Sequence, residues 1–470
     1  MKRAILSSFV LISSLYGEQV TVLGINDMHA NIDDLPQLAS FVKSERATTP
    51  HVLLLSAGDN RTGNPYVDNG EQPGVPMIQL MNMIGFDLST LGNHEFDTGR
   101  NGLQMAIHAA NFPFVCANVQ ADGGETLNIA PYHIFERNGI KIGVLGLVQI
   151  GTNGIPDVHP DNCKGLIFRD PMAVVRDYAY LRKECEVLII LSHMGFEADV
   201  KLARIFPEAD AIIGGHTHTR VENGHVENGV LITQAENKVK YITRLTFEVE
   251  NGLVTSKKSE LVSLKDYPKD TDMLAAVDKT KDNPYMRRVL TTITTDITRR
   301  ESLGCLMADA LRAYTKTDVA IVNFGNVRLS EFPAGPFTVE DCYRLDPFCN
   351  QTVVFRATGR ELIDFLNAVP ATDHHGAPCV SGMRYKAVKP AAELQPMRIT
   401  EATLENGTPI DPDAVYTVAT NTYLMSTVSA QPSDTGEAID MDGARSIMLY
   451  MDGKESVDYS NASNIDVTIE

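Results

Sequence analysis

Short apolar runs alternate with longer segments of mixed polarity through the first half of the chain. Six runs predict strands, over residues 19–24, 52–56, 88–91, 141–146, 187–191 and 211–214. Continuous apolar runs of this length are typical of strands that are buried on both faces. Amphipathic stretches such as residues 171–183 separate the runs and predict helices. The alternation predicts a layered α/β domain.

The second half of the chain has a different pattern. Residues 266–286 are polar and rich in Lys and Asp, and an apolar core at residues 273–277 predicts a helix within them. A predicted helix over residues 303–315 and a strand over residues 318–323 then precede several strand-and-turn segments. The length of 470 residues also exceeds what one hydrophobic core normally serves. We therefore expect a first domain over residues 18–265, a linker helix over residues 266–290 and a second domain over residues 291–470.

The first residues have the pattern of a secretory signal peptide. Lys2 and Arg3 precede an uncharged apolar stretch over residues 4–16, and the small residue Gly17 follows it. This stretch is too short for a membrane anchor, and no later segment is apolar for long enough to span a bilayer. We expect residues 1–17 to be removed, the mature chain to have no membrane span, and the protein to be periplasmic or secreted.

Charge and cysteine content narrow the function classes. The chain has 41 Lys and Arg against 60 Asp and Glu, for a formal net charge of −19. This balance argues against a nucleic-acid polymer as partner, because a phosphate backbone is bound by clustered Lys and Arg. An acidic protein can still bind an anionic substrate where metal ions supply local positive charge. Seven cysteines leave at least one unpaired; Cys342 and Cys349 could bridge, or several could be small buried residues.

Five polar motifs come directly after predicted strands or within a few residues of one. They are Asn26-Asp27-Met28-His29, Gly58-Asp59-Asn60, Gly92-Asn93-His94-Glu95-Phe96-Asp97, Ser192-His193-Met194-Gly195 and Gly214-Gly215-His216-Thr217-His218. Each motif alone is more typical of a turn, a helix cap or a core histidine. Ligands of α/β sheets bind outside the carboxyl ends of the strands. All five motifs are therefore expected to converge on one edge of one sheet.

The residue types in these motifs favour a metal site. Carboxylate, amide and imidazole groups without thiolates suit Zn, Mn, Fe or Co. With His94 set aside, two carboxylates, one amide oxygen and four histidines are too many for one tetrahedral ion. They fit two divalent metal ions bridged by one carboxylate.

These motifs resemble those of the calcineurin-like metallophosphoesterase superfamily, and the whole chain resembles the two-domain 5′-nucleotidase family. The resemblance implies a four-layer α/β sandwich with two metals, followed by a second α+β domain that binds the leaving group of the substrate. It also implies individual roles: Asp27, His29 and His218 bind the first metal, Asp59 bridges both metals, Asn93, His193 and His216 bind the second, and His94 and Asp97 form a catalytic pair.

The chemistry follows from these roles. A hydroxide that bridges the metals would attack phosphorus, and the metals and His94 would stabilise charge on the phosphoryl oxygens. Asp97, three residues after His94, would hold the correct tautomer of that imidazole and favour its charged form. A helix-start carboxylate is the alternative interpretation of Asp97.

The second domain carries further resemblances. The segment Asn323-Phe-Gly-Asn-Val-Arg328 resembles the family's Asn-Gly-Gly-Gly-Ile-Arg loop, and Asp346-Pro-Phe-Cys-Asn350 resembles its Pro-Phe-Gly-Asn segment. By this resemblance Asn323 and Arg328 contact substrate, together with either Arg299 or Arg300. Arginine suits this role because its planar fork binds phosphate or carboxylate through two hydrogen bonds.

The expected base pocket departs from the family pattern. The family usually holds a nucleobase between two aromatic rings, but the first ring position falls near Ala377, and Tyr423 is the candidate for the second. The Gly-Gly-Asp-Gly turn of the family is also missing after Tyr423. With one stacking face absent, we expect weak discrimination among bases, because every base offers a π-face.

The sequence thus predicts an exported phosphohydrolase that acts on nucleoside 5′-monophosphates or related small phosphate esters. Other reactions on the same scaffold are cyclic-nucleotide phosphodiester, nucleotide-sugar or sulfur-ester hydrolysis. A non-enzymatic binding or adhesion module is a third class, which missing metal ligands would favour; all the expected ligands are present.

Overall fold

The computed structural model describes residues 18–49, 51–69, 72–124, 127–348, 350–369, 376–389 and 397–469. The expected signal peptide of residues 1–17 and the thiol of Cys349 lie outside these ranges. The six described cysteines are free and buried, which fits small core residues. No helix in the described ranges is both long and apolar enough to cross a membrane.

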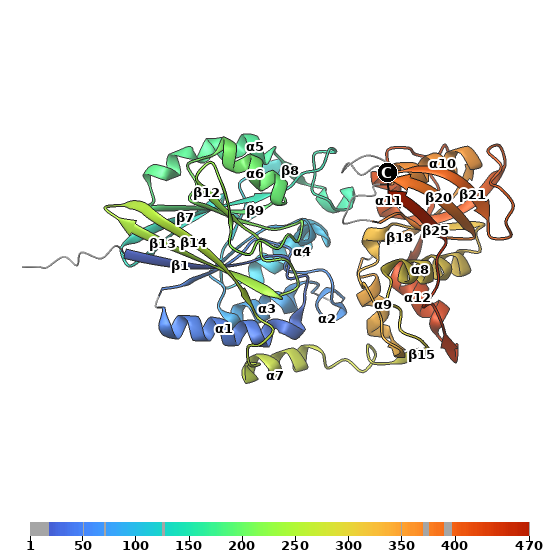
Figure 1. Cartoon of the computed structure of the whole chain (residues 1–470), viewed down its shortest axis with the longest axis horizontal. Helices are drawn as coiled ribbons and strands as arrows, with labels where there is room; N and C mark the ends of the chain where they lie inside the picture. Colours follow the sequence, from blue (N-terminus) through green and yellow to red (C-terminus); the bar gives the residue numbers. More distant parts are fainter. Residues whose placement is uncertain are drawn as a thin grey trace, which may run out of the picture.

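Two six-stranded sheets face each other in the N-terminal region (Figure 1). The first has the order β14-β13-β1-β2-β3-β4, with β1 Glu18–Ile25, β2 Leu53–Ser56, β3 Leu88–Thr90, β4 Phe114–Val115, β13 Tyr241–Glu250 and β14 Leu253–Ser263. The second has the order β11-β12-β10-β9-β7-β6, with β6 Tyr132–Arg137, β7 Ile140–Val148, β9 Val187–His193, β10 Ala211–Gly214, β11 His225–Glu227 and β12 Val230–Thr233. A separate short ribbon joins β5 Val119–Ala121 and β8 Leu166–Phe168.

Helices cover the outer faces of both sheets. The first sheet packs on α1 Leu35–Thr48, α3 Val75–Ile84 and α4 Gly99–Ala109, and the second on α5 Pro171–Val174, η5 Val175–Lys183 and α6 Phe196–Ile205. Shorter turns of helix are η1 Ile32–Asp34, α2 Pro65–Asp68, η2 His94–Phe96, η3 Asp122–Gly124 and η4 Pro160–Cys163. A separate apolar core lies between the two sheets and includes Val22, Leu55, Ile142 and Ile189. The four-layer α/β sandwich is therefore confirmed.

The expectation that all five motifs share one sheet is wrong. Three motifs follow β1, β2 and β3 of the first sheet, and two follow β9 and β10 of the second. An apolar run indicates a strand that is buried on both faces. Each of the two sheets lies between a layer of helices and the other sheet, so strands of both sheets are buried in this way. The pattern therefore predicts the strands but cannot assign them to a sheet.

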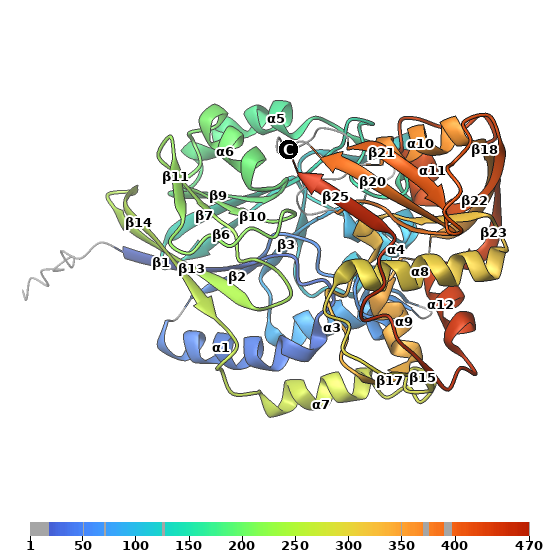
Figure 2. The same cartoon turned by 45° about the vertical axis from the view of Figure 1, so that its right-hand side comes forward.

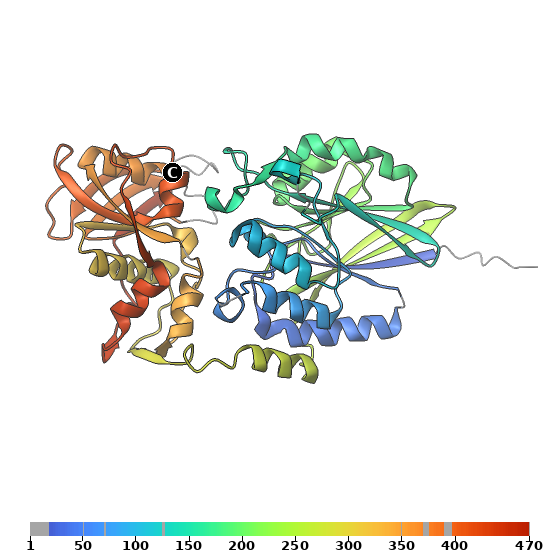
Figure 3. The ribbon, with the colours of Figure 1, turned by 180° about the vertical axis from the view of Figure 1, so that it is seen from behind.

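A single helix leads from the N-terminal to the C-terminal region. It is α7, Thr271–Thr280, and it runs along the lower edge of the molecule in Figures 1 and 3. Asp270 caps its start by accepting a hydrogen bond from the Met273 N–H at 2.9 Å. Met273 and Val277 are buried against the helical layer of α1 and α3. These contacts anchor the connection to the N-terminal sandwich.

The C-terminal region is an α+β assembly built on a five-stranded sheet (Figure 2). Its order is β19-β16-β22-β18-β23, with β16 Val319–Val322, β18 Gln351–Thr358, β19 Cys379–Ser381, β22 Val415–Asn421 and β23 Glu437–Asp442. Two three-stranded sheets contain β15 Val289–Ile293, β17 Gly335–Thr338 and β24 Ser456–Val457, and β20 Met383–Lys389, β21 Arg398–Leu404 and β25 Ile465–Ile469. The helices are α8 Arg300–Thr315, η6 Phe324–Asn326, α9 Val339–Leu345, α10 Gly359–Ala368, α11 Thr422–Thr427 and α12 Gly443–Met451.

The two regions touch beside the motif-bearing strand ends. The Tyr66 hydroxyl of the N-terminal region donates to Glu340 Oε2 at 2.9 Å. Arg328 Nη2 lies 3.3 Å from His29 Nδ1, and the ring of Phe348 stacks on that of His94 with centroids 5.8 Å apart. The C-terminal region thus meets the N-terminal sandwich at the edge where the polar motifs lie.

Candidate metal centre and substrate face

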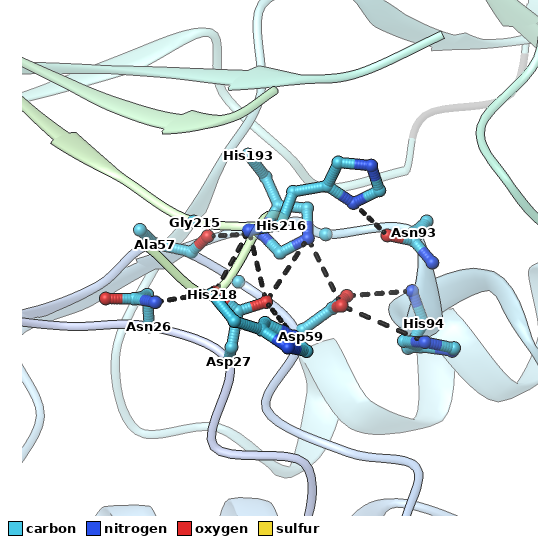
Figure 4. Close-up of polar contacts among 12 residues, drawn as sticks. Asn26, Asp27, Ala57, Asp59, Asn93, His94, His193, Gly215, His216 and His218 are labelled. Carbon is cyan, nitrogen blue, oxygen red and sulfur yellow. Dashed lines mark hydrogen bonds and ion pairs between the residues drawn. The ribbon is translucent and has the colours of Figure 1, made fainter. Parts of the chain in front are cut away.

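The polar motifs meet where the carboxyl ends of strands from the two sheets lie close together (Figure 4). Asp27 and His29 follow β1, Asp59 follows β2, and His193 is the last residue of β9. The sheets approach closely here: a Cβ on Gly24 would lie 2.8 Å from the side chain of Ile213. Glycine at this position lets side chains from both sheets reach one centre.

Three overlapping groups of donor atoms form the centre. They are Asp27, His29 and His218; His29, Asp59 and His94; and Asp27, Asp59 and His193, with the donor atoms of each group within 4.8 Å of one another. Asn93 and His216 complete the set, because His216 Nδ1 lies 3.1 Å from Asn93 Oδ1 and the His216 N–H donates to the Asp27 carboxylate. All seven residues expected as metal ligands are therefore brought together.

The positions of the ring nitrogens fit cation binding. His29 Nε2 and His218 Nε2 face each other at 3.0 Å, and both lie within 4 Å of Asp27 Oδ1. His193 Nε2 is buried 3.2 Å from Asp59 Oδ2 and has no well-aligned hydrogen-bond partner among the described residues. Converging lone pairs beside two carboxylates need a shared cation. The donor set of carboxylate oxygens and imidazole nitrogens suits divalent transition metals.

In His29 and His193, the ring nitrogen that faces away from the centre contacts a backbone carbonyl. His29 Nδ1 lies 3.1 Å from the Thr62 carbonyl, and His193 Nδ1 lies 2.7 Å from the Ala57 carbonyl. Such contacts orient a ligating histidine and raise the basicity of the nitrogen that faces the metal. These rings are therefore oriented before any ion arrives.

Five of the seven ligand candidates have left-handed backbone conformations. The φ angles are 50° at Asp27, 46° at His29, 52° at Asp59, 75° at His216 and 55° at His218. Non-glycine residues adopt this region at a cost of about 1 kcal/mol or more each. Such strain concentrates at functional sites, where the surrounding structure imposes it. Here it turns the side chains toward the centre.

Glu95 holds two of the motif loops together and was missed as a functional residue. Its buried carboxylate accepts hydrogen bonds from the backbone N–H groups of Asp59, Asn60 and Gly92 at 2.6–2.9 Å. Burial, followed by the neighbouring charge of Asp59, raises the pKa of Glu95. The sequence feature that could have identified Glu95 is its position directly after His94 within a motif. Glu95 fixes the loop that presents Asp59.

The centre attracts positive charge. Burial alone would raise the pKa of Asp59, but His193 and His94 outweigh it and hold that pKa well below its usual range. Burial would lower the pKa of His193, yet the carboxylates of Asp59 and Asp27 raise it to about 10. Burial, Arg328 and His218 lower the pKa of His29 and keep its imidazole neutral. Buried carboxylates that stabilise positive charge on the imidazoles beside them are the electrostatics of a cation site.

His94 and Asp97 are in direct contact. His94 Nδ1 lies 2.8 Å from Asp97 Oδ2, and the Thr62 hydroxyl donates to the same oxygen at 2.6 Å. Burial lowers the pKa of His94, but Asp97 and Asp59 outweigh that effect and raise it. The Nε2 of His94 lies 4.0 Å from Asp59 Oδ2 and therefore faces the centre. The expected three-residue spacing thus produces the contact, on the short helix η2.

The structure separates the two arginines between which the sequence could not decide. Arg300 donates to the carbonyls of Val327 and Phe324 at 2.6 and 3.1 Å, on the loop that carries Arg328. Arg299 is half exposed and pairs with Glu301. Arg300 therefore lies against the loop that carries Arg328, whereas Arg299 pairs with a neighbouring carboxylate in the first turn of α8.

Asn323 and Tyr423 lie at the ends of two adjacent parallel strands, β16 and β22. The Asn421 side chain donates to Asn323 Oδ1 at 3.3 Å and joins the two strand ends. Burial, followed by the charge of Asp157, raises the pKa of Tyr423 to about 12, so its hydroxyl is neutral. Phe324 begins the short helix η6 after β16, and Tyr423 lies in the short helix α11 after β22.

Phe324 is a second residue that sequence reasoning missed. A Cβ on Gly376 would lie 3.0 Å from its ring, which puts the ring beside the Ala377 position where an aromatic was expected. Arg300 covers the same ring, with its guanidinium 4.5 Å from the centroid. The sequence feature that could have identified Phe324 is a Phe at a position where the similar loop of the family has Gly. The Phe324 ring therefore lies beside the position where an aromatic ring was expected, although it comes from another loop.

Comparisons with known proteins agree with this geometry. Residues 20–220 match the calcineurin-like phosphoesterase family, and residues 279–430 match the family described as 5′-nucleotidase, C-terminal domain. The chain is 31% identical to a 5′-nucleotidase of Vibrio cholerae, over 68% of this chain and 68% of that protein. The chain belongs to the 5′-nucleotidase family.

A solved member of the 5′-nucleotidase family has the same overall fold. The crystal structure of a 5′-nucleotidase precursor from Thermus thermophilus superposes with a TM-score of 0.83 and 25% identity, over 96% of this chain and 99% of that one. Membership of the family implies divalent metal ions, and the Asp and His groups at the strand ends are the candidates to bind them.

Other relatives are much longer than this 5′-nucleotidase family member. The chain is 28% identical to the endonuclease YhcR of Bacillus subtilis over 88% of its own length, but it spans 38% of that relative. It spans 32% of the trifunctional nucleotide phosphoesterase YfkN of the same organism.

Proposed function

We propose that this chain is a phosphohydrolase that removes phosphate from nucleoside 5′-monophosphates or related small phosphate esters with two divalent metal ions. The observation that carries the proposal is the set of three donor groups that share Asp27, His29 and Asp59, next to the His94–Asp97 pair. One carboxylate common to two donor groups is the arrangement that a dinuclear site requires.

The residues of the centre would divide between two ions. Asp27, His29 and His218 would hold one, Asn93, His193 and His216 the other, and Asp59 would contact both. Bound divalent ions lower the pKa of water and polarise phosphoryl oxygens. Hydrolysis forms a bond from a water oxygen to phosphorus and breaks the ester P–O bond, and the leaving oxygen takes up a proton.

His94 would act on the substrate. Its Nε2 faces the centre, and its raised pKa keeps it charged over a wider pH range than an isolated histidine. A charged imidazole can donate to a phosphoryl oxygen or give a proton to the leaving group. Asp97 would hold the ring through Nδ1 and stabilise its positive charge.

The C-terminal region would bind the leaving group. Arg328 Nη2 lies 3.3 Å from His29 Nδ1, and the Arg328 guanidinium lies over the Phe348 ring. These contacts support a role for the guanidinium in binding the phosphoryl group. Phe324 and Tyr423 follow neighbouring strand ends and offer two aromatic faces. We therefore propose stacking of a base or another planar group between these rings, in place of the single stacking face expected from the sequence.

An assay that measures released inorganic phosphate and identifies the other products by chromatography tests the proposal. The purified protein, loaded in turn with Zn, Mn, Fe or Co, would be offered nucleoside monophosphates, sugar phosphates, a cyclic nucleotide, a nucleotide sugar and a sulfur ester. We expect inorganic phosphate from the monophosphates. Turnover of only the cyclic nucleotide, the nucleotide sugar or the sulfur ester would replace the proposed reaction, and no turnover of any compound would support a binding module.

Export is a further part of the proposal. It rests on the charged start and the apolar stretch of residues 1–17. Expression of the full chain followed by fractionation and N-terminal sequencing should find a mature protein that starts near Glu18, outside the cytoplasm. An intact N-terminus in the cytoplasm would contradict export.

A further inference from the structure

The loop that follows β2 contacts both the metal centre and the His94–Asp97 pair through one residue, Thr62. The Thr62 carbonyl lies 3.1 Å from His29 Nδ1. The Thr62 hydroxyl donates to Asp97 Oδ2 at 2.6 Å. Thr62 therefore contacts a metal-ligand candidate through its main chain and the partner of His94 through its side chain.

The main chain of this loop is fixed on two sides. The Asp68 carboxylate accepts hydrogen bonds from the backbone N–H groups of Thr62, Gly63 and Asn64 at 2.8–3.0 Å. On the other side, a Cβ on Gly63 would lie 2.6 Å from the His29 carbonyl oxygen, so the loop packs directly against that residue. Thr62 cannot move away from His29 unless these contacts break.

The backbone conformation of Thr62 is one that its side chain disfavours. Its φ angle is 69°, and a β-branched residue in the left-handed region is a genuine outlier. Glycine adopts this conformation without strain but has no hydroxyl. Thr62 is 3% exposed, and its hydroxyl is used for the contact with Asp97. Strain of this kind is concentrated at functional sites, and here it accompanies a side chain that reaches the proposed catalytic pair.

The Thr62 hydroxyl determines how the Asp97 carboxylate is turned. The last side-chain torsion of an aspartate has a broad distribution, so one contact to His94 Nδ1 would leave the carboxylate plane poorly defined. Thr62 and His94 meet the same oxygen, Oδ2. The Asn162 side chain donates to the Asp97 carbonyl at 2.8 Å and holds the main chain at this point. The orientation of the carboxylate, and with it that of the His94 ring, therefore depends on Thr62.

We propose that Thr62 is a positioning residue for the hydrolytic reaction. Its hydroxyl holds the Asp97 carboxylate against His94, while its carbonyl holds the ring of His29. Thr62 thereby sets the place of the His94 ring relative to a ligand of the first metal. This inference rests on the proposed function, in which His94 acts on the substrate.

Kinetics of AMP hydrolysis by the metal-loaded enzyme test this role. Thr62→Val removes the hydroxyl but keeps the carbonyl and the branched shape. It should lower kcat about tenfold or more, because a hydrogen bond to a charged group is lost. KM should change little, since the hydroxyl faces Asp97 and not the substrate. Thr62→Ser keeps a hydroxyl and should restore most of kcat.

A control variant and a metal count accompany these kinetics. Thr90→Val removes another buried hydroxyl of the same sandwich, which donates to the Val115 carbonyl at 2.8 Å, and should keep kcat close to that of the wild type. Thr62→Val should bind as many metals as the wild type, because its carbonyl remains beside His29. A change in KM alone, loss of metal in Thr62→Val, or a Thr62→Ser variant as slow as Thr62→Val would overturn the proposal.

A double-mutant cycle shows whether Thr62 acts through Asp97. In an Asp97→Ala background the partner of the hydroxyl is absent, so Thr62→Val should lower kcat much less than it does in the wild type. The same fold-loss in both backgrounds would mean that Thr62 acts independently of Asp97, and the proposed role would be wrong.

A crystallographic comparison separates this inference from the proposed function, because it requires no turnover. In zinc-loaded Thr62→Val the Asp97 carboxylate should rotate, and its contact with His94 Nδ1 should lengthen or be lost, whereas Thr62→Ser should keep the wild-type positions. If the protein hydrolyses no phosphate ester but Asp97 moves in this way, the positioning contact stands and the proposed reaction fails. Unchanged positions of Asp97 and His94 in Thr62→Val would exclude the role of Thr62.

Discussion

The metal centre and the substrate face are held in different ways. At the metal centre, Asp27, Asp59 and His193 are almost fully buried, and contacts from the surrounding chain fix each side chain. On the proposed substrate face, Arg328 and Tyr423 are only partly buried; Arg328 lies on the loop after β16 and Tyr423 in the short helix α11 after β22. The first region is defined by two packed sheets, the second by loop residues and a few hydrogen bonds.

This difference indicates that the metal centre determines whether a reaction occurs and that the proposed substrate face determines which compounds react. The strained backbone at five ligand candidates shows that the sandwich imposes their positions. Loops on a rigid scaffold accept substitutions more easily. The Phe324 ring lies against Gly376, next to Ala377, where the sequence lacks the expected ring. Changes at the metal centre should abolish reaction, whereas changes on the substrate face should alter which compounds react.

The largest effect is expected from Asp59→Ala. Loss of the shared carboxylate should reduce turnover by at least about a thousandfold, since metal ions supply several kcal/mol of charge stabilisation. Elemental analysis should find fewer than two metals per chain. Two retained metals in this variant would show that Asp59 does not bridge them.

A smaller loss is expected from His94→Ala. Removing a group that donates to the substrate should cost about 10²–10⁴-fold in turnover while both metals stay bound. Asp97→Asn should cost less, because the amide can still contact His94 Nδ1. Wild-type turnover in His94→Ala would remove the catalytic role, and metal loss would reassign His94 as a ligand.

On the substrate face, Arg328→Ala should raise KM more than Tyr423→Ala does. The reason is that every proposed substrate carries a phosphate group, whereas only some carry a nucleobase that can stack on Tyr423. Phe324→Ala and Tyr423→Ala should each weaken binding of AMP by about 1–3 kcal/mol and leave a simple sugar phosphate less affected. Parallel losses for AMP and the sugar phosphate would show that the rings do not contact a base.

The smallest effect concerns Asp346, which positions the substrate loops. This carboxylate accepts from the Phe348 N–H at 3.2 Å, and burial followed by the charge of Asp442 raises its pKa to about 8. When the pKa of a carboxyl is higher in the folded than in the unfolded state, its protonated form stabilises the fold. This stabilisation is fully present below the unfolded pKa of about 4. It is lost as the pH rises toward the folded pKa. Asp346→Asn removes this dependence.

Thermal unfolding at several pH values checks this prediction. The Tm of Asp346→Asn relative to wild type should be higher at pH 8 than at pH 5, by a few degrees. Activity at pH 5 should change little, because the asparagine resembles the protonated carboxyl. Parallel Tm curves for the two proteins between these pH values would contradict a raised pKa at Asp346.

The sequence by itself predicted the strands, the polar residues at their ends and the contact between His94 and Asp97. Apolar runs and a three-residue spacing are local properties, and local rules suffice to interpret them. All seven ligand candidates could be named before the structure was known because the motifs that contain them resemble those of the metallophosphoesterase superfamily.

Only the tertiary structure decided which sheet each motif belongs to, which of Arg299 and Arg300 contacts the loop that carries Arg328, and what Glu95 and Phe324 contact. These outcomes depend on packing between segments far apart in the chain. For example, the Asp27 carbonyl after β1 accepts a hydrogen bond from the Lys238 N–H in the loop before β13. They also depend on left-handed conformations that no local preference favours at Asp, His or Val. Such conformations persist only because the folded sandwich surrounds and holds them.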